Sequence, residues 1–303
     1  MNKKDTYPVT VVISTRNRGV IVSKTIQTIL QNDYPYFELI VIDQSENDIT
    51  GNSLRPLLTD HRIHYIKTAT EGFSTGLNLG ITYAQSDFIA IIHDDCEATT
   101  KWLRNLVGAL LIDHRIGIVF GNVFPGPHDR TKGFIPAYVR KEPLLVRNLW
   151  EKHKMEGMGA CMGLRRAVWQ ELSGFDEMLG PGAPFKAAED IDFSIRTLHA
   201  GYFVYETPSV AVIHQGFRTW EQGRELIRGY LYGLGTTHVK HFKCGHWLVL
   251  YYFLHLVGRW AFKHPAIDFG HSPSRLLRLE AFLQGILAGA LNSVDRITGH
   301  YVH

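Results

Sequence analysis

Short apolar runs alternate with amphipathic segments over the first 125 residues of the chain. The apolar runs, rich in β-branched residues, predict strands at residues 9–14, 37–42, 63–66, 88–92 and 117–124. Apolar side chains recur at helical spacing after the first run, at Val22, Ile26, Ile29 and Leu30, and again over residues 102–111. Strands and helices in alternation predict a mostly parallel sheet with right-handed crossovers.

Polar side chains stand where three of these strands end. They are Thr15, Arg16, Asn17, Asp43, Asp94 and Asp95. Ligands of open α/β sheets bind outside the carboxyl ends of the strands, so this pattern predicts a ligand crevice. Asp94 and Asp95 repel each other unless a cation or hydrogen-bond donors offset their charge, and hard oxygen ligands suit Mg²⁺ or Mn²⁺ carrying a phosphate. The alternative is a solvated turn in which one of the two caps the next helix.

The loop after the first strand excludes two common nucleotide-binding motifs. It reads Ser-Thr-Arg-Asn-Arg-Gly, with neither the Gly-x-Gly-x-x-Gly of a dinucleotide fold nor a P-loop. Asp43 as an acceptor for base or ribose, with Arg16 or Arg18 near phosphate, fits a mononucleotide whose diphosphate rests on a metal. Residues 71–78 form a glycine-bearing loop whose backbone donors face the nucleotide, or an ordinary helix start capped by Ser74.

Composition bears on the compartment and on the partner. The net charge of +3 is too small to indicate nucleic acid, and its excess lies C-terminal, with ten Lys/Arg against five Asp/Glu from Phe217 onward. Three widely spaced cysteines favour a reducing compartment. The first residues lack the apolar stretch of a signal peptide, and the longest apolar run, residues 247–258, is too short to span a bilayer. We expect a cytoplasmic protein, either free or at the inner face of the membrane.

These residues together resemble the family 2 glycosyltransferases, which have the GT-A fold. The resemblance rests on residues 14–18, 41–45, 72–78 and 93–95 and covers roughly residues 7–216. It implies an α/β, Rossmann-like, mixed and mostly parallel sheet flanked by helices. It also implies the residues of a donor site, in which Asp94 contacts the donor and Asp95 the metal. Nucleotide contacts then come from Thr15, Arg16, Asn17, Asp43, Gly72 and Asn78.

Residues 188–196 read Ala-Glu-Asp-Ile-Asp-Phe-Ser-Ile-Arg and open a predicted helix. Acids in a first helical turn complement the helix dipole, which is one interpretation of the motif. In the resembled family this element supplies the catalytic base, which assigns that role to Asp190. Glu189 then positions the acceptor or tunes Asp190, because close carboxylates push their pKa values apart. His214, after the run 210–213, either ligates the metal or contacts the diphosphate, or it is structural.

The resemblance implies an inverting transfer of a sugar from a nucleotide-diphosphate donor, a UDP-sugar being favoured, to a hydroxyl acceptor. Cell-surface polysaccharide or glycoconjugate synthesis is the expected setting, and Mg²⁺ or Mn²⁺ is the expected cofactor. We expect a catalytic domain over residues 1–216, with its nucleotide-sugar half up to about residue 125 and its acceptor half over 126–216. The alternatives are a sugar-phosphate nucleotidyltransferase and a non-catalytic membrane or assembly module.

The region from residue 217 to 303 is predicted to be mainly helical. Aromatic residues such as Trp247 and Tyr251 lie close to Lys243 and Arg259, and residues 276–290 carry leucines at helical spacing. Such faces suit an acidic membrane surface, which would bring the enzyme to a lipid-linked or polymeric glycan acceptor. They also suit packing on the catalytic domain or on a second subunit in a homodimer.

Overall fold

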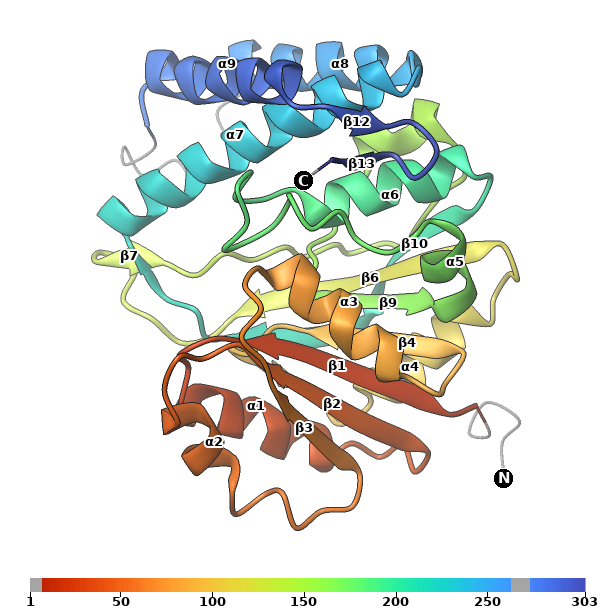
Figure 1. Ribbon diagram of the computed structural model, residues 1–303, viewed down its shortest axis with the longest axis vertical. Coiled ribbons are helices and arrows are strands. Elements are labelled where there is room, and N and C mark those ends of the chain that lie inside the picture. Colours follow the sequence, from red (N-terminus) through yellow and green to blue (C-terminus); the bar gives the residue numbers. More distant parts are fainter. Residues whose placement is uncertain (1–6, 263–272, 303) are drawn as a thin grey trace.

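A nine-stranded sheet forms the centre of the protein in the computed structural model, which describes residues 7–262 and 273–302. Its strands are β1 (Val9–Thr15), β2 (Phe37–Asp43), β3 (Ile63–Lys67), β4 (Phe88–Ile92), β5 (Cys96–Ala98), β6 (Ile116–Pro125), β8 (Leu144–Val146), β9 (Cys161–Arg165) and β10 (Phe203–His214). Their order is β3-β2-β1-β4-β9-β6-β10-β5, with β8 also beside β10 (Figure 1). The five predicted strands are all present.

Strand direction divides the sheet. The pairs β2–β3, β1–β2, β1–β4 and β6–β10 are parallel. Strand β9 runs antiparallel to both β4 and β6, and β5 and β8 run antiparallel to β10. The predicted mixed and mostly parallel GT-A sheet is confirmed, and β9 is the strand that joins its two parallel parts.

Both faces of the sheet are buried. Along β1, Val11 and Ile13 belong to the core under α1 (Val20–Leu30) and α4 (Trp102–Leu110), together with α2 (Ile49–Leu54). Val12 points to the opposite core, under α3 (Phe73–Tyr83), α5 (Arg166–Glu171) and α6 (Glu189–His199). Successive side chains of a strand face opposite sides of the sheet. A strand that is buried on both faces is therefore one continuous apolar run in the sequence.

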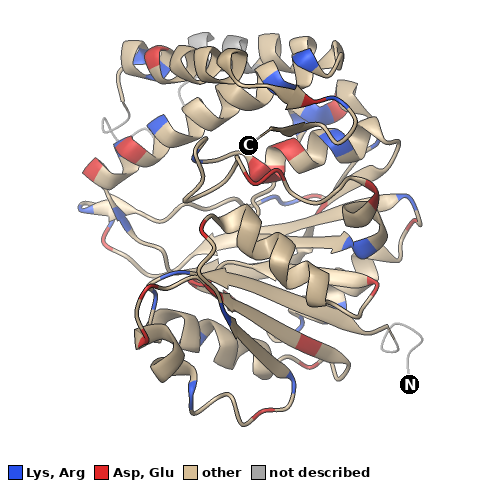
Figure 2. Ribbon diagram, viewed as in Figure 1, with Lys and Arg blue, Asp and Glu red and all other residues tan. Residues whose placement is uncertain are grey.

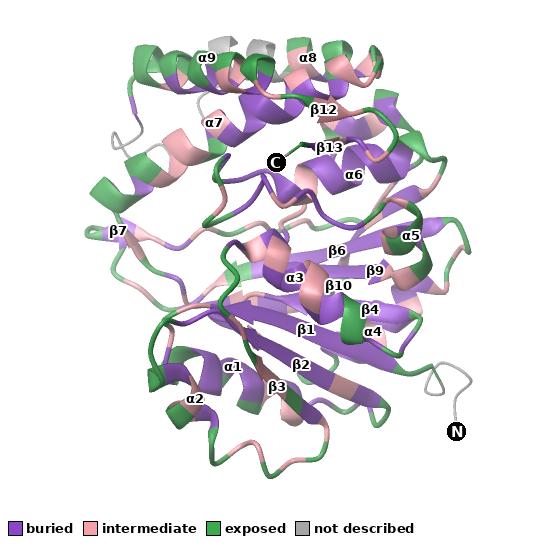
Figure 3. Ribbon diagram, viewed as in Figure 1, coloured by how far each residue is buried: buried purple, intermediate pink, exposed green. Residues whose placement is uncertain are grey.

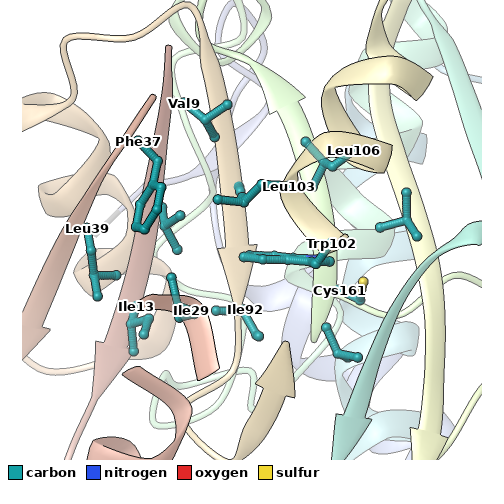
Figure 4. Packing of buried hydrophobic residues seen from close by; sticks show 14 of the residues in the cluster. Val9, Ile13, Ile29, Phe37, Leu39, Ile92, Trp102, Leu103, Leu106 and Cys161 are labelled. Carbon is teal, nitrogen blue, oxygen red and sulfur yellow. The ribbon is translucent and has the colours of Figure 1, made fainter. Parts of the chain in front are cut away.

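Trp102 fixes α4 to the sheet. Its side chain is fully buried and lies among Leu103, Leu106 and Cys161 (Figure 4). A Cβ atom on Gly163 of β9 would lie 2.6 Å from a Leu106 methyl carbon, so α4 approaches this strand as closely as a glycine permits. Truncating a buried aromatic side chain of this size costs about 3–5 kcal/mol.

Strand β9 begins only at Cys161, although small residues precede it from Gly157 onward. The N–H groups of Gly157 and Gly159 donate to the carboxylates of Glu206 and Asp190, so they are not available to a neighbouring strand.

One buried carboxylate orders the segment between β6 and β9, which lacks periodicity in the sequence. Glu206 of β10 accepts hydrogen bonds from the side chains of Arg140 and Tyr138, at 2.7 and 2.9 Å, and from two backbone N–H groups. The segment contains β7 (Gly133–Phe134), β8 and the 3₁₀ helix η2 (Leu149–Lys154). The middle of the segment and the part just before β9 are therefore joined at one point beside the sheet.

The last third of the chain forms a layer of helices over α6 (Figure 1). It comprises β11 (Arg218–Thr219), which pairs with β7, then α7 (Trp220–Lys243), α8 (Leu248–Phe262), α9 (Arg275–Leu291) and the hairpin β12 (Val294–Asp295) and β13 (His300–Tyr301). Thr219 begins α7 with a capping box closed by Gln222. Among the described helices, none is both long enough and apolar enough to cross a membrane.

Candidate active site

A cleft of about 470 Å³ opens where β1, β4 and β10 end. Side chains that follow these strands meet there with the first turn of α3 and one side of α7. Its lining includes Thr15, Arg16, Arg18, Gly72, Phe73, His93, Asp94, Asp95, Met158, Pro181, Lys186, His214, Arg218, Glu225 and Tyr230. A second hollow of about 380 Å³ shares Arg16 and Gln44 with the cleft and continues along residues 67–71. The predicted crevice at the carboxyl ends of the strands is therefore present.

Asp94 faces the cleft from the end of β4. The hydroxyl of Thr15 donates to its Oδ2 at 2.7 Å, and the Nε of Arg18 lies 3.4 Å from its Oδ1. Burial raises the pKa of Asp94 to about 6, although Arg18 opposes the shift. Neither Asp94 nor Asp95 caps a helix, because β5 follows directly and α4 begins at Trp102 behind Lys101. The capping alternative is wrong.

Asp95 and His214 meet at the floor of the cleft, with Nε2 of His214 3.2 Å from Oδ1 of Asp95. Nδ1 of His214 lies 2.7 Å from the carbonyl oxygen of Pro136. A carbonyl only accepts hydrogen bonds, so Nδ1 carries a proton, and in the neutral tautomer Nε2 offers a lone pair toward Asp95. Burial alone would raise the pKa of Asp95, but the neighbouring His214 and Arg18 lower it well below its usual value.

This pair is suited to a divalent cation. Both side chains are buried, and among the described residues Oδ1 of Asp95 has no hydrogen-bond donor. A lone pair on nitrogen and an unsatisfied carboxylate oxygen that face each other are what a cation would satisfy, and the carbonyl behind the imidazole fixes its orientation. Cys96 lies within ligand distance of both. Its thiol is fully buried, and soft sulfur ligands suit Mg²⁺ and Mn²⁺ less well than oxygen does, so Cys96 is the weakest candidate ligand of the three.

Asp43 is not brought together with the other predicted nucleotide contacts, because it lies outside the lining of both hollows. It is fully buried, its Oδ2 accepts from the hydroxyl of Tyr65 at 2.6 Å, and its Oδ1 accepts from the N–H of Ser45. Gln44, the next residue, lines both hollows and donates to the carbonyl of Gly72. Successive strand residues face opposite sides, so Gln44 is a further candidate for the nucleoside contact predicted at Asp43.

Asn17 and Asn78, also predicted as donor contacts, do not line either hollow. Asn17 is exposed, has a φ of 56° and lies outside both hollows; its backbone N–H donates to Ser45. Asn78 lies on α3 and is occupied by the backbone of Phe175, with which it exchanges two hydrogen bonds of 2.8 Å. Both residues hold loops that line the cleft, which the motif alone could not distinguish from contact with a ligand.

Gly72 lies at the N-cap of α3 and lines the cleft with a φ of 95°, a conformation that favours glycine. The alternative that Ser74 caps this helix is wrong, because its hydroxyl donates to the carbonyl of Leu179. The N–H of Phe73 likewise donates to the carbonyl of Pro181. The glycine-bearing segment 179–185 is thus attached to the start of α3 at the rim of the cleft.

Glu189 and Asp190 begin α6 next to the cleft wall. Oδ2 of Asp190 accepts from the N–H of Gly159 at 2.9 Å, and Met158 beside it lines the cleft. A Cβ atom on Gly180 would lie 3.3 Å from Oε2 of Glu189. Burial and the charge of Asp190 raise the pKa of Glu189 to about 8, and burial also raises the pKa of Asp190. At neutral pH, Glu189 therefore keeps its proton.

Two cations and a phenol in the cleft wall were not assigned from the sequence. Lys186 and Arg218 line the cleft, and Tyr230 joins them from α7. Arg18, which the sequence offered beside Arg16 as a phosphate contact, lies 3.5 Å from Oδ2 of Asp95. Arg218 and Tyr230 follow no strand of the nucleotide half, so only the tertiary path of α7 brings them here.

A family model described as glycosyl transferase family 2 matches residues 10–172. The probable glycosyltransferase YdaM of Bacillus subtilis is 23% identical over 235 residues, which cover 73% of this chain and 53% of that protein. The chain thus spans about half the length of this relative. Among solved structures, the mannosyltransferase PcManGT from Pyrobaculum calidifontis, in complex with GDP-Man and Mn²⁺, has a TM-score of 0.63 at 16% identity, covering 95% of this chain and 88% of that one. S. aureus TarS 1–349 with UDP-GlcNAc has a TM-score of 0.62 at 13% identity, covering 92% and 81%.

Proposed function

The chain belongs to glycosyl transferase family 2, and from this membership we propose that it transfers a sugar from a nucleotide-diphosphate donor to an acceptor hydroxyl with inversion at the anomeric carbon. The observation that carries the proposal is the Asp95–His214 pair, which shares one cleft with Arg18 and Arg218. A diphosphate has the charge and the hard oxygens that such a set of groups would bind.

On the donor side, Asp95 and His214 would hold Mg²⁺ or Mn²⁺, which supplies positive charge to the leaving diphosphate. Arg18 and Arg218 would bind the same phosphate oxygens, and Thr15 holds the carboxylate of Asp94 toward the donor. The second hollow, beside Arg16 and Gln44, is where we propose the nucleoside lies. A UDP-sugar is our proposed donor; TarS was solved with UDP-GlcNAc and PcManGT with GDP-Man.

On the acceptor side, Asp190 would act as the general base. The N–H groups of Gly159 and Ile191 hold its two oxygens, while Glu189 beside it stays protonated at neutral pH. As the acceptor oxygen forms its bond to the anomeric carbon, the bond to the diphosphate oxygen breaks and the hydroxyl proton passes to Asp190. We propose a polysaccharide or glycoconjugate acceptor, bound by the segment between β6 and β9.

The test combines product analysis with one substitution. Asp190→Asn should lower turnover by about 10²–10⁴, the usual contribution of a general base, while the Kd for a UDP-sugar with Mn²⁺ stays unchanged. Asp113→Asn, at a partly exposed acid paired with Arg115, is the matched control and should keep parental turnover. Parental turnover in Asp190→Asn would show that Asp190 is not the general base. Proton NMR showing a retained anomeric configuration would exclude inversion. Release of pyrophosphate from a nucleoside triphosphate and a sugar phosphate would identify a nucleotidyltransferase and overturn the proposed reaction.

A further inference from the structure

Helices α8 and α9 expose a broad apolar surface. It consists of Leu250, Leu254, Leu276, Leu279, Leu283 and Leu287, each of them 49–78% exposed, and we call it the α8–α9 face. The four leucines of α9 recur at spacings of three and four residues and so lie on one side of that helix. Figure 3 shows exposed residues along the outer side of α9 and buried ones toward α7. An apolar face of this kind marks an interaction site.

Close packing on α7 holds the α8–α9 face outward. Phe282, Gly285 and Gly289 are the inner residues of α9, and a Cβ atom on Gly285 would lie 2.1 Å from the carbonyl oxygen of Tyr232. Nζ of Lys243 donates to three carbonyl groups at the C-terminal end of α9, at 2.7–3.0 Å. Rotating α9 to bury its leucines would break these contacts. Their exposure is therefore built into the fold.

The charge around the α8–α9 face complements an anionic surface. Of the charged side chains that the structure describes between residues 243 and 291, three are basic, Lys243, Arg275 and Arg278, and one is acidic, Glu280. Helix α8 has no acid, and α9 has only Glu280, so most of both ribbons is uncharged in Figure 2. Two copies of this region facing each other would bring like charges together, whereas acidic lipid headgroups would attract them.

Aromatic residues border the α8–α9 face. Trp247 is 66% exposed and meets the half-exposed ring of Phe242 edge-on, with centroids 4.8 Å apart. Trp and Tyr are typical of the boundary between membrane and water, because they combine an apolar body with a polar group. On its other side, α8 packs against η2, where Trp150 contacts Tyr251 and Lys152 lies over the ring of Tyr252. The face is thus tied directly to the segment between β6 and β9.

We propose that the α8–α9 face lies in the interface of an anionic lipid bilayer. Helices of 15 and 17 residues are too short to span, but an apolar side flanked by cations lets them lie in the plane of the headgroups. The bilayer then holds η2 and the segment around it at the lipid surface. That the acceptor is itself lipid-linked rests on the proposed function; the surface contact does not.

The test is flotation of the full chain with vesicles of phosphatidylcholine alone or with a quarter of phosphatidylglycerol, at low salt. We expect at least tenfold stronger partition with the anionic vesicles, and release in 0.5 M NaCl. The triple variant Leu279→Gln, Leu283→Gln, Leu287→Gln should lose at least tenfold of this partition. The matched control is Val20→Gln, Ile49→Gln, Ile112→Gln, at residues 62–76% exposed elsewhere on the protein, and it should float like the parent.

Three outcomes would overturn the inference: a parent that stays in solution with both vesicles, a triple variant that floats like the parent, or a parent dimer that the triple variant converts to monomer without any vesicle binding. Melting temperatures and the Kd for a UDP-sugar with Mn²⁺, measured on all three proteins, distinguish loss of the surface from loss of the fold. Sugar transfer to a soluble acceptor without flotation would overturn this inference and leave the proposed function intact. Flotation without any donor binding would support this inference and contradict the proposed function.

Discussion

Nζ of Lys240 on α7 lies 2.6 Å from Oδ1 of Asp192 on α6, and neither side chain is exposed to solvent. The same ammonium group donates to Asp176 at 2.6 Å, and Asp176 also accepts from the backbone N–H of Tyr301. Burial opposes ionisation of Asp192, yet Lys240 and Arg196 hold its pKa well below the usual range. One buried cation therefore ties the helix that begins with Glu189 and Asp190 to the C-terminal layer.

Lys240→Met should cost about 3–5 kcal/mol of stability, because it leaves two buried carboxylates without their shared cation. Urea denaturation followed by circular dichroism gives the free energy of unfolding. Lys101→Met, at an exposed lysine, is the matched control and should change it by less than about 0.5 kcal/mol. Equal stability in the two variants would show that the cluster does not hold the layers together.

The free energy of unfolding should fall as pH rises from 4.5 to about 8, in part because of Glu189. In this window the folded protein keeps a proton on Glu189 that the unfolded chain has released, so folding takes up a proton and is disfavoured at higher pH. Glu189→Gln should flatten the dependence by up to about 1.4 kcal/mol per pH unit. Urea titrations at pH 5, 6.5 and 8 measure it, with exposed Glu225→Gln as control. If the free energy of unfolding of Glu189→Gln and of the parent changed equally with pH, Glu189 would not keep its proton in the folded state.

His214→Gln should weaken Mn²⁺ binding in the presence of UDP by at least about tenfold, the loss typical even of an outer-shell partner. Its imidazole, oriented by Pro136, faces Oδ1 of Asp95 at 3.2 Å. Mn²⁺ titration followed by electron paramagnetic resonance reports free metal directly. His64→Gln, at a half-exposed histidine on β3, should bind as the parent does. A Kd for Mn²⁺ unchanged by His214→Gln would leave this histidine with a structural role only.

Replacing two helical glycines by alanine should change the stability of the protein in opposite directions. At Gly80 of α3 a Cβ atom would lie 2.5 Å from Cγ1 of Val12, and such overpacking costs about 1–3 kcal/mol. At Gly108 of α4 a Cβ atom meets nothing within 4 Å among the described residues, so Gly108→Ala should stabilise by about 0.5–1 kcal/mol. Melting temperatures of the two variants test the contrast. Stabilisation by Gly80→Ala would mean that α3 does not press on β1 as the structure has it, and destabilisation by Gly108→Ala would contradict the open space beside that glycine.

The nucleotide half was predictable because β1, β2 and β4 are buried on both faces, which makes them continuous apolar runs ending in polar residues. Strand direction was harder. The apolar residues of β9 would fit a parallel or an antiparallel strand. In the fold, β9 lies between β4 and β6 and runs antiparallel to both. At the site, motif reasoning brought Thr15, Asp94, Asp95 and His214 together correctly. It did not foresee that the polar groups of Asp43 and Asn78 are hydrogen-bonded to other residues within the protein.

Strands β6 and β9 are antiparallel neighbours, so the long segment between them leaves the sheet at Pro125 and returns beside it at Cys161. It is in effect the loop of a hairpin, and doubling the length of such a loop costs only about 0.6 kcal/mol in closure entropy. A foreign segment grafted here must still supply the carbonyl that orients His214, which Pro136 provides, and the hydrogen-bond donors of Glu206. A buried carboxylate without its donors would cancel the gain. On the proposed function, exchange of this one segment would change which acceptor the protein binds.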